Sequence, residues 1–350
     1  MKEVYSIKRE LFKVNDETFA KLDILEGYPD LYKQVQYMDK IKTWLVQTPY
    51  RDYTITIASA DASFRKYYRL TKDDKTLLLM DSSQEKESLA PFLDVTTRLL
   101  NADVKAPKIL EQNLEEGFLI IEDFGNTHYL NVLSDENFKE LYSNAIDEII
   151  KMQKADSSNL SLYDKAFLHF EMDLMKEWYL KKNLSISLTQ TEENLIEKTL
   201  DIISDIVLSQ PQGVFVHRDF HSRNIMITAQ KEVGIIDYQD AMSGAITYDL
   251  VSLLKDCYIE YKRGDIEKLA LEFRDKLGVN ASDSEFIKWF DFMGLQRHIK
   301  VLGIFSRLYL RDAKDGYLKD IPLTLKYTIE TAFRYDETKE FAKLLQELTQ

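Results

Sequence analysis

The stretch that decides the fold is HRDFHSRN at residues 217–224. It follows the pattern H-R-D-x-x-x-x-N, in which an aspartate and an asparagine stand five positions apart. In phosphoryl transfer, an Asp at this place accepts the proton of the acceptor hydroxyl, and the Asn holds a Mg2+ ion that bridges nucleotide phosphates. Asp219 is therefore the candidate catalytic base, and Asn224 is a candidate metal ligand.

A second candidate metal ligand, Asp237, lies thirteen residues beyond Asn224. The chain between them contains two short β-rich runs, at 224–227 and 233–237, joined by a polar turn, which is the pattern of a hairpin. A hairpin returns the chain on itself, so we expect Asn224 and Asp237 to meet around one cation. Mg2+ suits this pair because it needs few protein oxygen ligands and takes the rest from phosphate and water. The alternative is that Asp219 and Asp237 are simply polar residues at strand ends.

The loop, its second histidine and the following stretch IIDYQDAMSGAITYDLVSLLKDCY at 235–258 resemble the aminoglycoside-phosphotransferase-like superfamily of protein-kinase-like enzymes. Within it, the chain is most similar to bacterial anomeric sugar kinases that phosphorylate N-acetylmuramate and N-acetylglucosamine at C1 in cell-wall recycling. The resemblance covers about residues 38–335. It is also carried by ASFRKYYRL at 62–70, FLIIEDFG at 118–125 and RHIKVLGIFSRLYLRDAKDGYL at 297–318, of which the last is specific to the sugar kinases.

This resemblance implies an α+β, protein-kinase-like bilobal fold, with a small antiparallel-sheet N-lobe and a larger, mainly helical C-lobe. We expect an N-terminal helical extension at 1–37, a nucleotide-binding N-lobe at 38–125, and a C-lobe at 126–350 for catalysis and acceptor binding. The implied cofactors are ATP and Mg2+.

Local patterns predict the elements. Hydrophobic periodicity and glycine or proline breaks predict helices at 16–25, 30–47 and 91–100, the last with Pro91 at its first position. Short β-rich runs predict strands at 53–57, 64–70, 76–80 and 118–122. Beyond Gly125, we expect helices at 135–154, 164–182, 192–208, 247–262, 265–277, 283–311 and 322–348.

The expected N-lobe has no Gly-rich phosphate loop, because no glycine occurs between Gly27 and Gly117. Glycines let backbone N–H groups approach phosphate closely. Small and hydroxylated residues at 59–63, among them Ser63, would have to serve instead.

The N-lobe also lacks the usual phosphate-binding lysine, since the strand LLLMD at 77–81 stands where V-A-I-K would place it. Strand alternation puts Arg65 and Arg69 on one face. A guanidinium binds phosphate through two hydrogen bonds, so we expect one of the two to replace the lysine; the alternative is a solvated strand face. By the resemblance, Glu122 ends the strand whose hinge meets adenine.

Other residues of the catalytic region have expected roles. Mg2+ prefers oxygen, so His221 is expected to position the loop or to contact acceptor rather than bind metal. Asp240 is a candidate acceptor contact. By resemblance, His217 and Arg218 are scaffold, and Asp249 is expected to cap the helix that follows it.

A basic stripe marks the expected helix at 283–311, where Arg297, Lys300, Arg307 and Arg311 fall within a narrow arc. One interpretation is an amphipathic helix with a solvated basic edge. The other is that Arg297 and Lys300 face an anionic acceptor group, such as the lactyl carboxylate of N-acetylmuramate, and repel aminoglycosides and choline. The side expected to be apolar carries Leu295, Ile299, Leu302, Phe305 and Leu310.

Composition limits the function classes. A formal charge of −13 and a pI near 5.0 argue against binding to nucleic acid, which needs clustered Lys and Arg. The single cysteine, Cys257, excludes an intrachain disulfide and is expected to be a buried thiol. No apolar run has the length of a signal peptide or membrane span, so we expect a cytoplasmic protein. We also expect a monomer whose partner is a small amino sugar.

The sequence thus predicts an ATP- and Mg2+-dependent kinase that phosphorylates an amino-sugar hydroxyl at the anomeric position. An alternative within the superfamily is an aminoglycoside or small-alcohol phosphotransferase. An alternative of another class is a nucleotide-binding regulator with little turnover, motivated by the missing lysine and glycines.

Overall fold

The structure is a computed structural model that describes residues 30–59 and 65–350. The helix expected at 16–25 and the candidate nucleotide contact Ser63 lie outside these residues. The chain divides into two compact units, one made of Met1–Glu85 and Ile109–Asp123, the other of Lys86–Lys108 and Phe124–Gln350. The segment Lys86–Lys108 therefore groups with the second unit, whereas the boundary we expected near residue 125 put it with the first.

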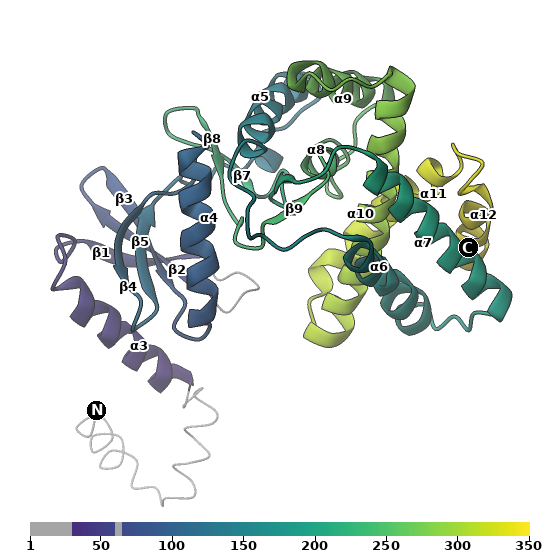
Figure 1. Ribbon diagram of the computed structural model, residues 1–350. Helices are drawn as coiled ribbons and strands as arrows, with labels where there is room; N and C mark the ends of the chain where they lie inside the picture. The colour runs from purple at the N-terminus through teal and green to yellow at the C-terminus, as the bar shows by residue number, and fades with distance from the viewer. Residues whose placement is uncertain (1–29, 60–64) are drawn as a thin grey trace, which may run out of the picture. The chain divides into compact units, whose positions relative to one another are not determined.

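The first unit contains a five-stranded antiparallel sheet in the order β1-β2-β3-β5-β4 (Figure 1). Its apolar core joins the sheet to helix α3 (Asp30–Leu45) through Ile41, Leu70, Leu79 and Phe118. The strands are β1 (Thr54–Ser59), β2 (Lys66–Lys72), β3 (Lys75–Asp81), β4 (Ile109–Asn113) and β5 (Phe118–Glu122). The predicted sheet is confirmed and gains β4, which was not expected.

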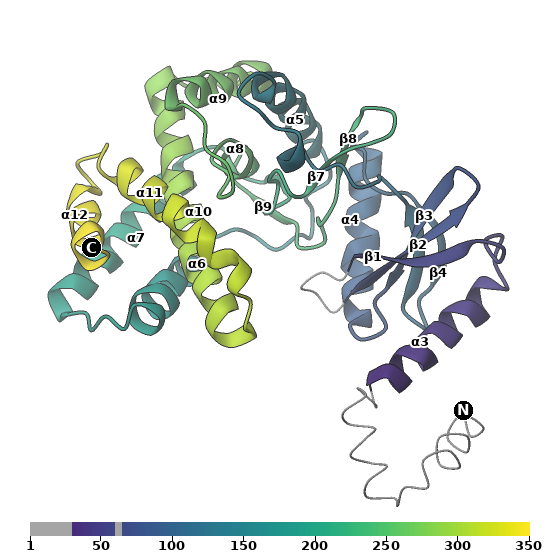
Figure 2. The ribbon, with the colours of Figure 1, turned by 180° about the vertical axis from the view of Figure 1, so that it is seen from behind.

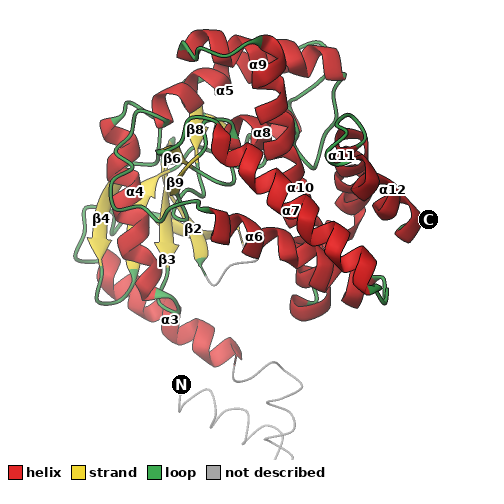
Figure 3. Cartoon of the chain, turned by 45° about the vertical axis from the view of Figure 1, so that its right-hand side comes forward, coloured by secondary structure: helices red, strands yellow, loops and turns green. Residues whose placement is uncertain are grey.

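The second unit is mainly helical, as the helices of Figure 3 show. Its helices are α4 (Leu89–Asn101), α5 (Phe138–Met152), α6 (Lys165–Leu174), the π-helix η3 (Met175–Asn183), α7 (Gln190–Ser209), α8 (Tyr248–Leu254), α9 (Arg263–Leu277), α10 (Asp283–Asp312), α11 (Ile321–Ala332) and α12 (Lys339–Leu348). Short 3-10 helices are η1 (Lys86–Ser88), η2 (Tyr129–Asn131) and η4 (Asp315–Asp320). The α+β fold class predicted from the sequence is confirmed.

Several predicted helices differ in extent. The helix expected at 164–182 is α6 followed by a π-helix, and the one expected at 322–348 is two helices. The helix expected at 247–262 ends at Leu254, and Pro91 is the third residue of α4, which begins at Leu89. Of the described helices, none is long and apolar enough to cross a membrane.

Helix α10 is the central element of the second unit, and it packs against α6, α7, α8 and α11 (Figure 2). Its contact with α6 depends on Gly303, where an added Cβ would overlap the backbone of Leu174. Leu295, Ile299, Leu302 and Phe305 are buried as expected, but Leu310 is exposed, because the last turns of α10 extend beyond the core.

Two short antiparallel strand pairs contain the candidate catalytic region. Strand β6 (Val214–Val216) pairs with β9 (Met242–Gly244), and β7 (Ile225–Ile227) pairs with β8 (Val233–Ile235). The loop at 217–224 runs from β6 to β7, so both of its ends are fixed by strand pairing. The hairpin predicted around 224–237 is confirmed.

Candidate active site

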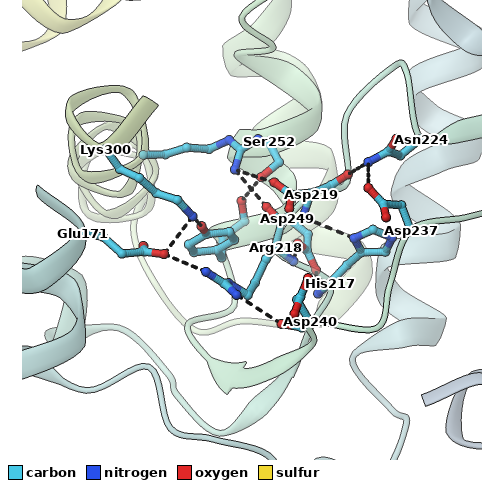
Figure 4. A network of polar contacts seen from close by, with 12 residues as sticks. Glu171, His217, Arg218, Asp219, Asn224, Asp237, Asp240, Asp249, Ser252 and Lys300 are labelled. Atoms are coloured by element: carbon cyan, nitrogen blue, oxygen red, sulfur yellow. Dashed lines mark hydrogen bonds and ion pairs between the residues drawn. The ribbon is translucent and has the colours of Figure 1, made fainter. Parts of the chain in front are cut away.

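The hairpin brings the two candidate metal ligands together. The side-chain amide of Asn224 donates a hydrogen bond to Oδ2 of Asp237 at 3.3 Å and another to the backbone oxygen of Asp219 at 3.0 Å (Figure 4). Asp237 is exposed and Asn224 half-buried, so both residues reach solvent. No group of three or more acidic, histidine or cysteine ligands occurs among the residues described, but Mg2+ needs only one or two protein oxygens. The pair fits that ion.

Asp219 lies beside buried cations of α10. Its side chain keeps 46% of its surface exposed, and one carboxylate oxygen lies 3.9 Å from Nη1 of Arg297. Desolvation would raise the pKa of Asp219, but the charges of Lys300 and Arg297 outweigh it and lower the pKa to about 2. The carboxylate is therefore ionised at neutral pH and can accept a hydrogen bond from an acceptor hydroxyl.

Arg297 and Lys300 are both only 4% exposed. Arg297 donates to the backbone oxygen of Arg218 at 2.8 Å, and Lys300 donates to the hydroxyl of Tyr248 at 3.0 Å. The solvated-edge interpretation is therefore wrong for these two cations. It holds for Arg311, which is exposed and pairs with its neighbour Asp312.

Glu171, the buried counter-ion of this cluster, was not predicted from the sequence. Its Oε1 lies 2.7 Å from Nη2 of Arg218 and 2.9 Å from Nζ of Lys300, and Oε2 accepts from Gln296 at 3.2 Å. Burial would raise the pKa of Glu171, but Lys300 and Arg218 lower it overall. A signal existed, because Glu171 lies three residues after Leu168, on the helix face that is buried.

Two further buried carboxylates hold the catalytic loop. Asp249 accepts hydrogen bonds from the backbone N–H groups of His217 at 2.8 Å and Arg218 at 3.1 Å. Our expectation that Asp249 caps α8 is wrong, because the N-cap residue is Thr247 and the Asp249 side chain is used by the loop. Asp256, which we did not predict, accepts from the backbone N–H of Ser222 at 2.9 Å and from its hydroxyl.

The remaining loop residues have defined contacts. His217 donates a hydrogen bond from Nε2 to the backbone oxygen of Ile236 at 3.0 Å, and its Nδ1 accepts one from the backbone N–H of Asp219 at 3.2 Å. Both contacts hold the loop in place, as expected for a scaffold residue. His221 packs edge-on against Tyr258, with ring centroids 5.3 Å apart, and burial lowers its pKa.

Asp240 is exposed, and its backbone oxygen accepts a hydrogen bond from Arg218 at 3.4 Å. Figure 4 shows Asp240 on the same side of Arg218 as His217. The candidate acceptor contact therefore lies next to the charged cluster.

The candidate nucleotide residues belong to the first unit. Arg69 forms a two-pronged pair with Asp123, at 2.7 and 3.1 Å, so the solvated-face interpretation is wrong for this side chain. Arg65 is buried, with 6% of its surface exposed, and Glu122 is half-buried at the end of β5.

The fold and these contacts define a phosphotransferase. Residues 54–276 match the Phosphotransferase enzyme family, and the chain belongs to this family. Membership implies use of ATP as phosphate donor. The resemblance predicted from the catalytic loop is confirmed.

Two relatives have names that are more specific than that of the family. The N-acetylmuramate/N-acetylglucosamine kinase of Neisseria meningitidis serogroup B is 40% identical over 327 residues, which cover 90% of this chain and 96% of that protein. The protein of the same name from Pseudomonas aeruginosa is 37% identical over 299 residues, which cover 84% of this chain and 88% of that one.

Solved structures show the same fold at low identity. A choline/ethanolamine kinase family protein from Mesorhizobium loti has a TM-score of 0.61 at 13% identity, covering 89% of this chain and 99% of that chain. The ADP-bound aminoglycoside phosphotransferase APH(2'')-Ib has a TM-score of 0.56 at 16% identity, covering 87% and 99%. The protein-kinase-like architecture is confirmed.

Proposed function

We propose that this protein is an ATP-dependent kinase that phosphorylates the anomeric hydroxyl of N-acetylmuramate and N-acetylglucosamine. Two relatives named N-acetylmuramate/N-acetylglucosamine kinase align along most of the chain. The observation that carries the proposal is the carboxylate of Asp219, which keeps 46% of its side chain exposed and whose loop is joined to the Asn224 and Asp237 pair. The setting would be cell-wall recycling in the cytoplasm, where ATP is available.

In this proposal Asp219 orients the acceptor hydroxyl. A carboxylate whose pKa is about 2 is a weak base at neutral pH, so its main contribution is to accept the hydroxyl hydrogen bond and aim the oxygen at the γ-phosphorus. It takes the proton only as the new O–P bond forms. Catalysis by positioning and by charge neutralisation is typical of phosphoryl transfer.

Asn224 and Asp237 are the residues that would hold Mg2+. When bound, the ion neutralises charge on the nucleotide phosphates. The chain's own contribution is to fix these two side chains at the ends of one hairpin, 3.3 Å apart.

Arg297 and Lys300 place two buried positive charges on the acceptor side of the second unit, where Glu171 is the counter-ion of Lys300. We propose that these two charges attract the lactyl carboxylate of N-acetylmuramate and repel cationic acceptors. Arg297→Ala and Lys300→Ala are then expected to weaken the binding of N-acetylmuramate more than that of N-acetylglucosamine. Equal weakening would rule out the carboxylate role. His221 and Asp240 are the proposed contacts for neutral parts of the sugar.

For the nucleotide, we propose that Arg65 or Arg69 takes the place of the missing lysine, with Ser63 and the strand end at Glu122 also in contact. Asp123 holds the Arg69 guanidinium in a fixed orientation, as a buried glutamate would hold a lysine. Arg65→Ala and Arg69→Ala are expected to raise the ATP Michaelis constant. If neither changes it, this assignment fails.

The test of the proposed function is ADP release with ATP and Mg2+, measured for N-acetylmuramate, N-acetylglucosamine, kanamycin, choline and no acceptor. Turnover with both N-acetyl sugars is expected, and Asp219→Asn is expected to lower kcat by roughly a hundredfold or more. Turnover with kanamycin or choline alone would instead assign the small-alcohol or antibiotic class. ATP binding without acceptor-dependent ADP release would assign a regulator.

A further inference from the structure

Four aromatic rings of the second unit form an unbroken series that ends beside the catalytic cluster. Neighbouring ring centroids are 6.1 Å apart for Phe170 and Phe167, 5.2 Å for Phe167 and Tyr163, and 4.9 Å for Tyr163 and Tyr248. The hydroxyl of Tyr248 accepts the hydrogen bond from Lys300. We call these four residues the aromatic series.

Exposure rises along the series. Tyr248 and Tyr163 are buried, with 1% and 5% of their surfaces exposed, Phe167 is half-buried, and Phe170 is 62% exposed. The inner rings are held in the core, and they support outer rings that meet solvent. A single exposed Phe needs no explanation, but Phe170 packs against Phe167, which itself lies against Arg218.

The inner of the two outer rings, Phe167, lies next to a charged group of the site. The guanidinium carbon of Arg218 is 5.5 Å from the centre of the Phe167 ring. The same guanidinium pairs with Glu171 and donates to the backbone oxygen of Asp240. The Phe167 ring, against which Phe170 packs, is thus a neighbour of a charged, hydrogen-bonding group.

We propose that the exposed ring of Phe170 forms a stacking surface for the pyranose ring of the acceptor, supported from behind by Phe167, Tyr163 and Tyr248. A pyranose offers an apolar face of C–H groups and an edge of hydroxyls. The C–H face matches the electron-rich face of an aromatic ring, and the hydroxyl edge matches groups such as Arg218 and Asp240. This inference rests on the proposed function, because it names how the same site recognises its sugar.

The charges near the series decide between possible occupants. Aromatic rings also bind quaternary ammonium groups such as choline. Here the guanidinium of Arg218 already lies against Phe167, and the ammonium of Lys300 is 5.7 Å from the centre of the Tyr248 ring. A second cation placed against either of these rings would lie close to the first, whereas the neutral C–H face of a pyranose would add no charge there.

The test compares Phe170→Ala and Phe170→Trp with the wild type in steady-state kinetics, using N-acetylglucosamine and N-acetylmuramate as acceptors. Phe170→Ala is expected to raise the acceptor KM roughly three- to tenfold with little change in the ATP KM, and Phe170→Trp is expected to retain a low acceptor KM. Leu310→Ala, which removes another exposed apolar side chain of the same unit, is the matched control and is expected to leave both constants unchanged.

A second measurement detects the contact between the sugar ring and the aromatic side chains directly. In saturation-transfer NMR, N-acetylglucosamine ring C–H protons are expected to receive saturation from wild-type aromatic protons and to lose most of it in Phe170→Ala. Normal turnover with an unchanged KM and unchanged transfer in Phe170→Ala would overturn the stacking surface but leave the proposed function intact. A wild type that turns over choline and neither sugar would overturn both.

Discussion

Oδ2 of Asp249 accepts the backbone N–H of His217 at 2.8 Å, and its Oδ1 accepts that of Arg218 at 3.1 Å. These two amides stand at the start of the loop. Arg218 has a backbone φ of +77°, a conformation that residues other than glycine rarely adopt. One buried carboxylate therefore satisfies two donors and holds a strained residue directly before Asp219. The position of the proposed catalytic carboxylate, that of Asp219, is thus fixed by a residue of helix α8.

Asp249→Asn is expected to lower kcat at least tenfold while the protein stays folded. The amide keeps one acceptor oxygen, but its NH2 group would face a backbone N–H, so one loop contact is lost. Steady-state kinetics and circular dichroism would measure the two effects. Asp312→Asn, at a surface pair with Arg311, is the matched control; an unchanged kcat in Asp249→Asn would mean that the loop holds its own geometry.

Glu171→Gln is expected to destabilise the protein by about 3 kcal/mol, because it leaves the buried Lys300 and the half-buried Arg218 without their counter-ion. Adding Lys300→Met to Glu171→Gln removes one of the uncompensated charges, so the double variant should be more stable than Glu171→Gln alone. Urea unfolding of the wild type, both single variants and the double variant gives the coupling free energy. Additive effects would show that the two side chains do not depend on one another.

Gly303→Ala is expected to lower both the melting temperature and kcat. The new Cβ would overlap the backbone of Leu174, so α10 must move away from α6, and the pairing of Lys300 with Glu171 would loosen. Gly264→Ala is the control, since nothing lies within 4 Å of a Cβ added there. Equal stability of the two variants would mean that α6 adjusts without cost.

Much of the fold and of the site was predictable because it depends on residues close in sequence. The spacing of Asp219, Asn224 and Asp237 implies a loop and a hairpin, and these bring Asn224 and Asp237 into contact. The burial of Cys257 followed from its apolar neighbours, and burial raises its pKa to about 11. Periodicity also predicted helix α10 within one residue at its end.

What could not be predicted depends on contacts distant in sequence. Glu171 is 129 residues from Lys300 and 47 from Arg218, and no local pattern shows that the three meet. The π-helix Met175–Asn183 begins where α6 passes Gly303 of α10, which no local pattern indicates either. Strand β4 reads ILEQN, too polar to be distinguished from a loop before its pairing with β5 is known.

His298 is expected to make the protein less stable as the pH falls below about 6.5. Its ring is fully buried, donates to the backbone oxygen of Lys255 at 2.9 Å and stacks on Tyr327. Burial, together with the charge of Lys255, lowers the pKa of His298 to about 3. The unfolded chain, where the pKa is about 6.5, therefore binds the proton more readily, so acid favours unfolding.

The contribution of His298 is complete above pH 6.5 and is lost as the pH falls toward 3, with a slope of up to about 1.4 kcal/mol per pH unit. His298→Phe keeps a ring against Tyr327 and removes the titrating group. It is expected to be less stable than the wild type at pH 7.5, by about 1 kcal/mol for the lost hydrogen bond. The free energy of unfolding, measured in urea between pH 7.5 and 5, should however fall less steeply in the variant. Because every other titrating group is shared, parallel curves for the two proteins would show that His298 is protonated in the folded state as readily as in the unfolded chain.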